Sequence, residues 1–311
     1  MISVIAPAHS APMSFYRRLT GFLRKPGREK SSSIRFHTRY TLAKLPFFPV
    51  PHRLLIDNVS QWFVSPCFMP RFTDRSRFLE FITEDNAELR FAWRFLEPDM
   101  TFLDIGAYRG IYSLIASKRV TRSGMVVAFE PSSRDRRWLE LNAWLNAVRG
   151  LTVEPYALGA ASGTSSLFVV VSGYTSMNSL RAPAIDQPTT EVPIEVTTLD
   201  EYCAKRTLKR VDLMKVDTEG GELDVFRGAT EVLARHRPLI ICEVLDWVTR
   251  PWGRAAVDTV DYLADRGYEW FEFEEDGRVR PHTRRTEYPE VKNYLAVPRE
   301  RLSVVDHLRA N

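Results

Sequence analysis

The chain has 311 residues, of which 44% are hydrophobic, 26% charged and 12% aromatic, and this composition excludes disorder over most of its length. No stretch approaches the roughly 18 consecutive apolar residues that a membrane-spanning helix needs, and the first residues lack a secretory signal pattern. Residues 1–54 hold ten Lys and Arg and one Glu, a charge of +9, so that the net charge of +4 leaves −5 for the remainder. The excess of basic residues is confined to residues 1–54, so the positive net charge is no sign of a nucleic-acid-binding domain. We therefore expect no nucleic-acid partner.

The three cysteines lie far apart in the sequence. Cys67, Cys203 and Cys242 are odd in number, and no two of them have the spacing of a metal-binding pair. This pattern predicts neither a disulfide framework nor a zinc site. We therefore expect buried free thiols and a reducing, cytoplasmic environment.

The N-terminal third divides into two segments. Residues 1–50 are basic and rich in proline, and they predict a mobile arm. Within the arm, residues 15–25 have the pattern of a short basic amphipathic helix, which either lies on the inner face of an anionic membrane or packs on its own domain. Residues 51–98 contain many Phe and Trp side chains and predict an ordered helical cap.

Residues 99–311 have a regular pattern that predicts one domain. Short apolar runs, typical of buried strands, alternate with segments that have apolar residues at helical spacing. The runs cover 101–105, 125–130, 151–158, 211–217 and 238–244, and the first helices cover 111–120 and 134–147. In the second of these helices, Trp138, Leu141 and Leu145 share one face. The alternation predicts an α/β fold with a doubly wound, mostly parallel sheet.

Two pairs of segments depart from this alternation. Residues 164–171 and 192–198 have the apolar–polar alternation of two antiparallel strands. Residues 268–273 and 293–298 form a second such pair near the end of the chain. Because an antiparallel edge is common on a doubly wound sheet, we expect one here.

A glycine-rich turn connects the first predicted strand to the first helix. Asp104 ends the strand, and Gly106 and Gly110 follow at positions four apart rather than in a G-x-G-x-x-G pattern. Such a turn lets the backbone approach a ligand closely, and the carboxylate of Asp104 favours a ligand with positive charge. S-adenosylmethionine, with its ammonium and sulfonium groups, is such a ligand. In the alternative interpretation the turn is a plain one and Asp104 caps the helix.

Acidic residues follow two further strands. Glu130 lies 20 residues after Gly110, at the end of the second strand, where a carboxylate can accept hydrogen bonds from both ribose hydroxyls. Asp217, Glu219 and Glu222 cluster where a later strand meets a helix. Since ligands of open α/β sheets bind beyond the carboxyl ends of the strands, these acids are expected to face one crevice.

Six stretches between residues 100 and 298 form a set: TFLDIGAYRGIYSL, VVAFEPSSRDRRWLELNAWLN, YALGAASGTSSL, VTTLDEY, VDLMKVDTEGGELDVFRGA and PLIICEV. This set resembles the FkbM family of S-adenosylmethionine-dependent methyltransferases. The resemblance implies the Rossmann-like fold of class I methyltransferases, with seven strands. The family usually has Asn where this chain has Tyr108, and often an aliphatic residue where it has Arg109.

The resemblance also implies an activity and a cofactor site. The activity is O-methylation of a hydroxyl on a sugar, a glycan or glycolipid, or a polyketide-type small molecule, with S-adenosylhomocysteine as the product. Carried over position by position, the methionine end of the cofactor is lined by Asp104, Gly106, Ala107 and Gly110, the ribose is held at Glu130 and Pro131, the adenine edge lies near Ala157 and Leu158, and the transferred methyl group lies near Asp217.

Methyl transfer to a hydroxyl needs a group that takes the hydroxyl proton. A positioned carboxylate can do so, and Asp217 and Glu219 are the candidates. Alternatively, Asp217, Glu219 and Glu243 hold a divalent cation that acidifies the hydroxyl. Contacts to a small-molecule or glycan acceptor are expected from the variable connections, at Tyr174, Ser176, Asn178 and Trp247, with Trp252 nearby.

Two other functions fit the sequence less well. One is an NAD-dependent oxidoreductase, which the four-residue glycine spacing and Asp104 disfavour. The other is a degenerate member of the fold that binds a cofactor or partners without catalysis. Tyr108 and Arg109 are the features that favour this last interpretation.

Overall fold

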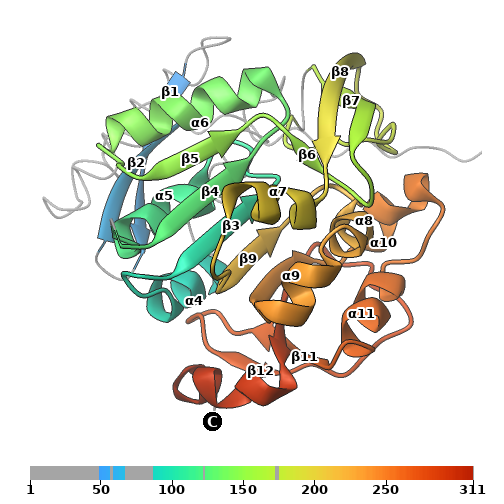
Figure 1. The fold of residues 1–311 in the computed structure, drawn as a ribbon. Helices are drawn as coiled ribbons and strands as arrows, with labels where there is room; N and C mark the ends of the chain where they lie inside the picture. Colours follow the sequence, from blue (N-terminus) through green and yellow to red (C-terminus); the bar gives the residue numbers. More distant parts are fainter. Residues whose placement is uncertain (1–48, 57–58, 67–86, 122, 172–174, 311) are drawn as a thin grey trace, which may run out of the picture.

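The computed structural model describes residues 49–56, 59–66, 87–121, 123–171 and 175–310 (Figure 1). Residues 1–48 of the predicted arm, with its helix at residues 15–25, and Cys67 lie outside the described residues, so membrane contact through the arm stays a prediction. Within the described residues, no helix combines the length and the apolar character that crossing a lipid bilayer requires.

In the described part of the chain, eight strands form the central sheet in the order β12-β11-β13-β10-β9-β3-β4-β5. They are β3 (Thr101–Ile105), β4 (Met125–Phe129), β5 (Leu151–Glu154), β9 (Leu213–Val216), β10 (Leu239–Glu243), β11 (Tyr268–Phe273), β12 (Val279–Pro281) and β13 (Asn293–Pro298). The strands from β10 to β5 run parallel, and β13, β11 and β12 pair antiparallel. The predicted parallel sheet with an antiparallel edge is confirmed. The expected seven strands become eight because β12, with three residues, is too short to produce a sequence pattern.

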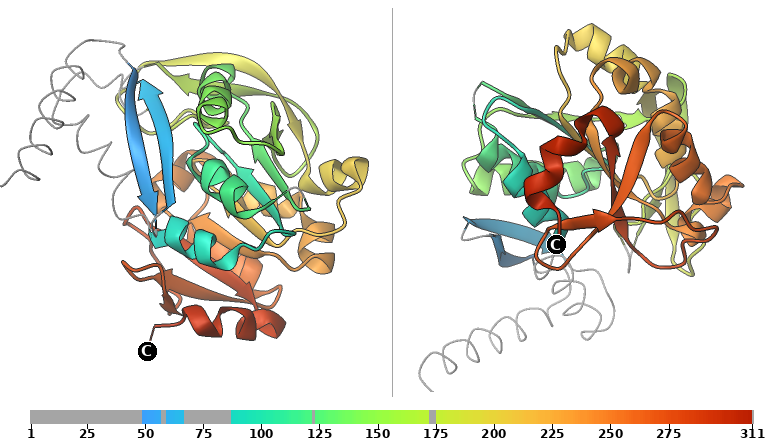
Figure 2. Two further views of the ribbon diagram at one scale, coloured as in Figure 1. Left: turned by 90° about the vertical axis from the view of Figure 1, so that its left-hand side faces the viewer. Right: turned by 90° about the horizontal axis from the view of Figure 1, so that it is seen from below.

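Helices cover both faces of this sheet (Figures 1 and 2). They are α4 (Ala87–Phe95), α5 (Ile111–Arg119), α6 (Ser133–Leu145), α7 (Leu199–Arg206), α8 (Glu222–Arg227), α9 (Thr230–Arg235), α10 (Asp246–Thr249), α11 (Val257–Ala264) and the 3₁₀ segments η1 (Arg250–Trp252) and η2 (Arg299–Leu308). Neighbouring residues of one strand supply opposite cores: Phe102 packs with α4 and α5, and Leu103 packs with α7, α8, α9 and α11. Two buried cores therefore hold the strand ends in place.

The segment before the central sheet is only partly helical. Residues 49–66 form two antiparallel strands, β1 (Pro49–Ile56) and β2 (Val59–Pro66), and α4 follows at residue 87. The predicted helical cap over residues 51–98 is therefore wrong for its first part. The sequence of β2 is rich in Val, Trp and Phe, which are residues that favour a pleated strand over a helix.

A second, small sheet stands apart from the central one. Within the described residues it has the order β6-β8-β7, with β6 (Ala157–Leu158), β7 (Gly163–Val170) and β8 (Thr189–Thr197). The predicted antiparallel pair is confirmed as β7 and β8. The run expected as one strand over residues 151–158 divides into β5 and β6 around Pro155, which has no N–H to donate to a ladder.

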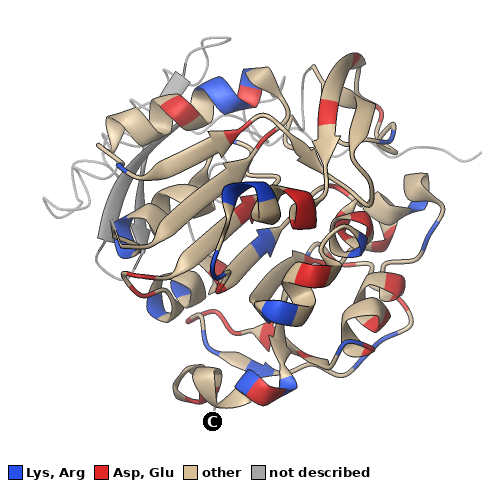
Figure 3. Cartoon of the chain, in the orientation of Figure 1, with Lys and Arg blue, Asp and Glu red and all other residues tan. Residues whose placement is uncertain are grey.

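Helix α6 buries a different face from the one predicted. Leu141 and Leu145 are 37% and 39% exposed, while Asp135, Leu139 and Asn142 are buried. Leu139 packs over Gly110, and the two polar side chains hydrogen-bond to Arg109. Buried polar partners therefore decided the orientation of the helix. Charged residues of both signs lie along α6, α7 and α9 (Figure 3).

Candidate active site at the carboxyl edge of the sheet

Four strand ends align at one edge of the central sheet. Ile105 at the end of β3 pairs with Phe129 of β4 and with Val216 of β9, and Val216 pairs with Cys242 of β10. The residues that come next therefore follow one another along this edge in the order Glu130, Gly106, Asp217 and Glu243. The predicted convergence of the glycine turn and the acids is found, because parallel strands in register end together.

The glycines of the turn are required by close approach of neighbouring elements. Gly106 has φ +78°, and a Cβ placed there would lie 1.8 Å from the carbonyl oxygen of Asp217. Gly110 has φ +85°, and its Cβ would lie 2.8 Å from Cγ of Leu139. Both positions need glycine before any ligand is considered. The backbone N–H groups of Gly106 and Ala107 both donate to the Phe129 carbonyl, which ties the turn to β4.

Asp104 acts as a cap for helix α5. Its side chain is buried, and Oδ2 accepts hydrogen bonds from the Ser113 backbone N–H at 2.9 Å and from Ser113 Oγ at 2.5 Å. Burial raises the pKa of Asp104 to about 6 against the effect of these donors. The contact of this carboxylate with the cofactor stays a prediction, and the structure shows Oδ2 engaged with Ser113. This oxygen satisfies a free N–H in the first turn of α5.

Glu130 fixes the glycine turn from the end of β4. Oε2 accepts from the Tyr108 backbone N–H at 2.7 Å, and Oε1 accepts from the Ser132 N–H at 2.8 Å. Burial and the neighbouring Asp135 carboxylate raise the pKa of Glu130 to about 8. Tyr108 has φ +51°, a left-handed conformation that Asn adopts more readily than Tyr. This conformation therefore suits Asn better than the Tyr that this chain has at the position.

The raised pKa of Glu130 predicts a pH-dependent stability. A carboxyl group with a folded pKa of about 8 and an ordinary unfolded pKa favours the folded state at low pH, and this contribution is lost as the pH rises through 8. Glu130→Gln removes the titration, so its free energy of unfolding should fall less between pH 5 and 9 than that of the wild type, by on the order of 3 kcal/mol. Urea unfolding at each pH measures the difference, and parallel curves for the two proteins would contradict it.

A buried charge network lies on the other side of the turn. Asp135, at the start of α6, accepts from Arg109 Nε at 3.3 Å, from Arg134 NH2 at 2.7 Å and from Asn178 Nδ2 at 2.9 Å. Thr175 Oγ1 is 2.8 Å from the Tyr108 hydroxyl and 3.2 Å from Arg109 NH2. The network joins the glycine turn, α6 and the segment after β7. Arg109, which belongs to the turn, contacts Asp135 on α6 and Thr175 after β7.

A lysine stands among the acids at the ends of β9 and β10. Lys215 is buried, and its Nζ donates to Asp217 Oδ2 at 3.0 Å and to Asn293 Oδ1 at 2.8 Å. Burial alone lowers the pKa of Lys215, but the Asp217 and Glu243 carboxylates outweigh burial and raise it. The lysine is therefore a permanent cation that fixes the orientation of Asp217.

Glu243 differs from its acidic neighbours. Its Oε2 is buried and has no hydrogen-bond partner within the described residues. Burial, followed by repulsion from Asp217, raises the pKa of Glu243 well above its ordinary value. Burial and the Glu243 carboxylate likewise raise the pKa of Glu219 well above its ordinary value. The backbone of Glu219 has a left-handed φ of +54°. A buried carboxylate oxygen without a partner is costly, and such atoms often face a ligand site.

Glu222, the remaining acid of the predicted cluster, accepts hydrogen bonds within the turn after β9. Glu222 Oε1 accepts from the Thr218 N–H at 2.8 Å, from Thr218 Oγ1 at 3.0 Å and from the Gly220 N–H at 3.2 Å. Among the residues that the structure describes, no three His, Cys, Asp or Glu side chains are arranged to hold a metal ion. The alternative of a cation held by Asp217, Glu219 and Glu243 is therefore not supported.

The other predicted site residues differ in their surroundings, and one of them lies outside the described residues. Tyr174 lies outside the described residues, and Ser176 is half-buried beside it in sequence. Asn178 is part of the Asp135 network, where its Oδ1 also accepts from the Val170 N–H at 3.0 Å, and its contact with an acceptor stays a prediction. Trp247 packs against Val170, Met177, Leu245 and Val248. Ala157 and Leu158 form β6 and are buried, and Pro131 is half-buried after Glu130.

The sequence analysis did not identify two residues of the site, Lys215 and Asn293. Lys215 lies on β9, two residues before Asp217, which follows the strand, and this spacing in an extended chain could have indicated that they interact. Asn293, at the start of β13, gave no signal because only the pairing of β13 with β10 brings it to Lys215.

The strand order, with five parallel strands and an antiparallel β13 between β10 and β11, defines the class I methyltransferase architecture. The model of the FkbM methyltransferase domain matches residues 104–270, more than half of the chain. The chain therefore belongs to the FkbM methyltransferase family.

Two curated relatives match parts of the chain. Methyltransferase 1 of Beauveria bassiana is 29% identical over 148 residues, which are 42% of this chain and 59% of that protein. The AMB antimetabolite synthetase AmbE of Pseudomonas aeruginosa is 25% identical over 209 residues, 56% of this chain and 10% of that protein. The crystal structure of methyltransferase FkbM from Methylobacillus flagellatus KT is 17% identical, with a TM-score of 0.40, over 86% of this chain and 60% of that one.

Proposed function

We propose that the chain is an O-methyltransferase that transfers a methyl group from S-adenosylmethionine to a hydroxyl of a sugar, a glycan or glycolipid, or a polyketide-type small molecule. The observation that carries the proposal is the acidic strand-end cluster, in which Asp217, Glu219 and Glu243 stand beside the single lysine Lys215. Such a cluster favours a cationic ligand and supplies groups that can accept a proton.

The residues at the edge fit this cofactor. Each oxygen of the Glu130 carboxylate has accepted one backbone N–H and keeps a further lone pair for a ribose hydroxyl. The cofactor carries an ammonium and a sulfonium, and a positive charge beside Glu219 and Glu243 lowers the free energy of their ionised forms. Binding of the cation is thus expected to convert buried neutral carboxyl groups into carboxylates.

When bound, the cofactor supplies a methyl group that its sulfonium activates for in-line displacement. The chain's own residues would align the acceptor hydroxyl with this methyl group, and a strand-end carboxylate would take the hydroxyl proton, with S-adenosylhomocysteine as the product. Asp217 is held by Lys215 at 3.0 Å and serves as a fixed charge. Glu243, whose Oε2 has no partner within the described residues, is the better proton acceptor.

One observation favours the degenerate alternative. The Tyr108 hydroxyl bonds to Thr175 and the Tyr108 N–H bonds to Glu130, so this turn is already stabilised without a ligand. A protein that keeps the fold without methyl transfer would need such contacts in place of a cofactor.

Calorimetric titration with S-adenosylhomocysteine separates the two functions. We expect saturable binding by the wild type and at least tenfold weaker binding by Glu130→Ala, because a ribose loses its carboxylate partner. NAD is the control ligand and should give no heat of binding. A folded wild-type protein that does not bind S-adenosylhomocysteine would favour the degenerate alternative.

A further inference from the structure

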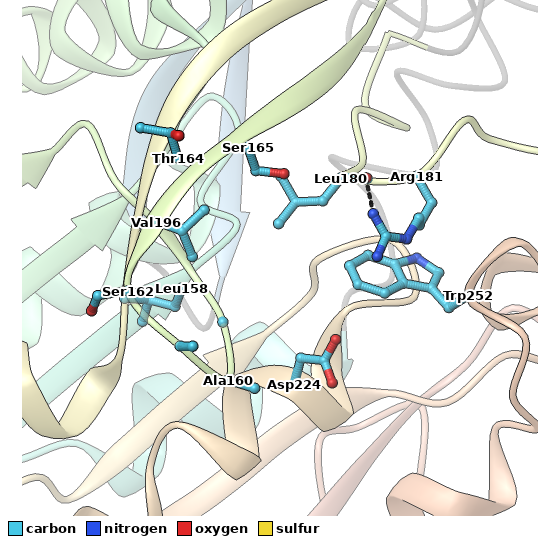
Figure 4. Close-up of a pocket in the computed structure, with 13 residues that line it drawn as sticks. Leu158, Ala160, Ser162, Thr164, Ser165, Leu180, Arg181, Val196, Asp224 and Trp252 are labelled. Atoms are coloured by element: carbon cyan, nitrogen blue, oxygen red, sulfur yellow. Dashed lines mark hydrogen bonds between the residues drawn. The ribbon is translucent and has the colours of Figure 1, made fainter.

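A cavity of about 210 Å³ lies between the small sheet and the elements that follow β9 and β10 (Figure 4). Leu158, Ser162 and Val196 line one side of it, and Trp252 and Arg181 lie on the other. This volume is below the range of about 300–1,000 Å³ typical of drug-sized ligands, so the cavity suits a single ring.

Trp252 connects this cavity to the acidic strand-end cluster. Its indole Nε1 donates to the Glu219 carbonyl at 3.2 Å. The indole also lies directly on the turn after β9: a Cβ on Gly220 would be 2.6 Å from its Cδ1, and one on Gly221 would be 3.0 Å from its Cη2. A ligand against Trp252 is therefore separated from the acid-bearing turn by the indole alone.

Arg181 gives the cavity a positive charge that no acidic side chain among the described residues pairs with. Its guanidinium lies over the Trp252 indole, with Cζ 5.3 Å from the ring centroid. Among the described residues it makes one hydrogen bond, to the Leu180 carbonyl at 3.3 Å, and no ion pair. The guanidinium thus keeps the paired N–H donors that bind a carboxylate or phosphate.

The acid in the cavity does not oppose this charge. Asp224 lines the cavity, but its carboxylate accepts from Arg254 NH1 at 2.9 Å and from Arg254 NH2 at 2.7 Å. Hydrogen bonds from Arg254 outweigh burial and lower the pKa of Asp224. Arg227 NH1 lies 3.3 Å from the same carboxylate, so two guanidinium groups surround Asp224 and outweigh its charge. An anionic group entering the cavity therefore meets Arg181 as a charged partner without opposition from Asp224.

We propose that this cavity is an acceptor subsite that binds one anionic sugar ring. The ring packs against Trp252 and Leu158, and its carboxylate or phosphate group binds Arg181. Aromatic faces beside apolar side chains accommodate the C–H faces of a sugar, and Ser165, which also lines the cavity, offers a hydroxyl. The inference rests on the proposed methyl transfer to a sugar-bearing acceptor and specifies which sugars the site selects.

The test uses ligand-observed NMR on the full chain with glucuronate, glucose 6-phosphate and glucose. Glucuronate and glucose 6-phosphate distinguish a carboxylate from a phosphate source, and glucose is the neutral comparison. We expect one or both anions to bind the wild type at least tenfold more tightly than glucose. Arg181→Gln should reduce their binding to the level of glucose. The matched control Arg235→Gln changes an exposed arginine that pairs with Glu231 on α9 and should leave binding unchanged.

Three results would overturn the subsite: equal binding of glucose and the anions, full anion binding by Arg181→Gln, or no binding of any of the three sugars. Displacement of the sugars by S-adenosylhomocysteine would assign the cavity to the cofactor and would also overturn it. Titration of the same samples with S-adenosylhomocysteine keeps the two proposals apart. Loss of that binding in the wild type counts against methyl transfer, whereas loss of sugar binding alone counts against the subsite.

Discussion

Glu243→Gln is expected to lower the rate of methyl transfer by about 10²–10⁴-fold while S-adenosylhomocysteine still binds. The amide has the shape of the carboxyl group but cannot take the acceptor's proton. Glu243 already has a buried oxygen without a partner in the described part of the chain, so the exchange removes no protein hydrogen bond from that atom. The measurement is single-turnover methyl transfer to an acceptor found by screening, with binding followed by calorimetry.

The pH dependence gives an independent check on Glu243. Because burial raises the pKa of Glu243, the wild-type rate should fall as the pH decreases, with a midpoint above that of an ordinary carboxyl group. Asp217→Asn is the comparison variant, since its carboxylate is paired with Lys215 and has a positioning role. We expect Asp217→Asn to retain the acidic limb of the profile. A Glu243→Gln enzyme with the wild-type rate would exclude Glu243 as the base.

Gly106→Ala should destabilise the fold severely, for two separate reasons. The left-handed φ of +78° costs a side-chain-bearing residue about 1–2 kcal/mol. A Cβ would in addition lie 1.8 Å from the Asp217 carbonyl oxygen, so β3 and β9 would have to separate where they end. We expect a loss of about 3–5 kcal/mol in the free energy of unfolding, or no soluble folded protein. Urea unfolding measures it.

Gly253→Ala is the matched control for this change. Gly253 has a similar φ of +70°, but beyond its own chain neighbours no atom of the described residues lies within 4 Å of an added Cβ. The free energy of unfolding that Gly253→Ala loses should therefore reflect the backbone conformation alone, about 1–2 kcal/mol. Equal losses for the two variants would show that the approach of Gly106 to Asp217 does not matter.

The sequence by itself determined the fold and the position of the site. Buried strands leave continuous apolar runs, and the residues that end those runs are recognisable as Gly106, Glu130, Asp217 and Glu243. Since parallel strands in register end at one edge, their convergence follows from local pattern alone. The family stretch around Asp217 added the class of reaction.

Only the tertiary structure decided what each polar side chain does. The Asp104 carboxylate accepts from the first turn of α5, and the Asn178 amide donates to Asp135, and neither partner could be predicted from the sequence. A buried polar group takes whichever partner the fold brings to it, and that partner can lie far away in the sequence. Lys215 and Asn293 are 78 residues apart and meet only because β13 pairs with β10. Hydrophobic periodicity is local and can be read from the chain, whereas hydrogen-bond partners depend on the register of distant strands.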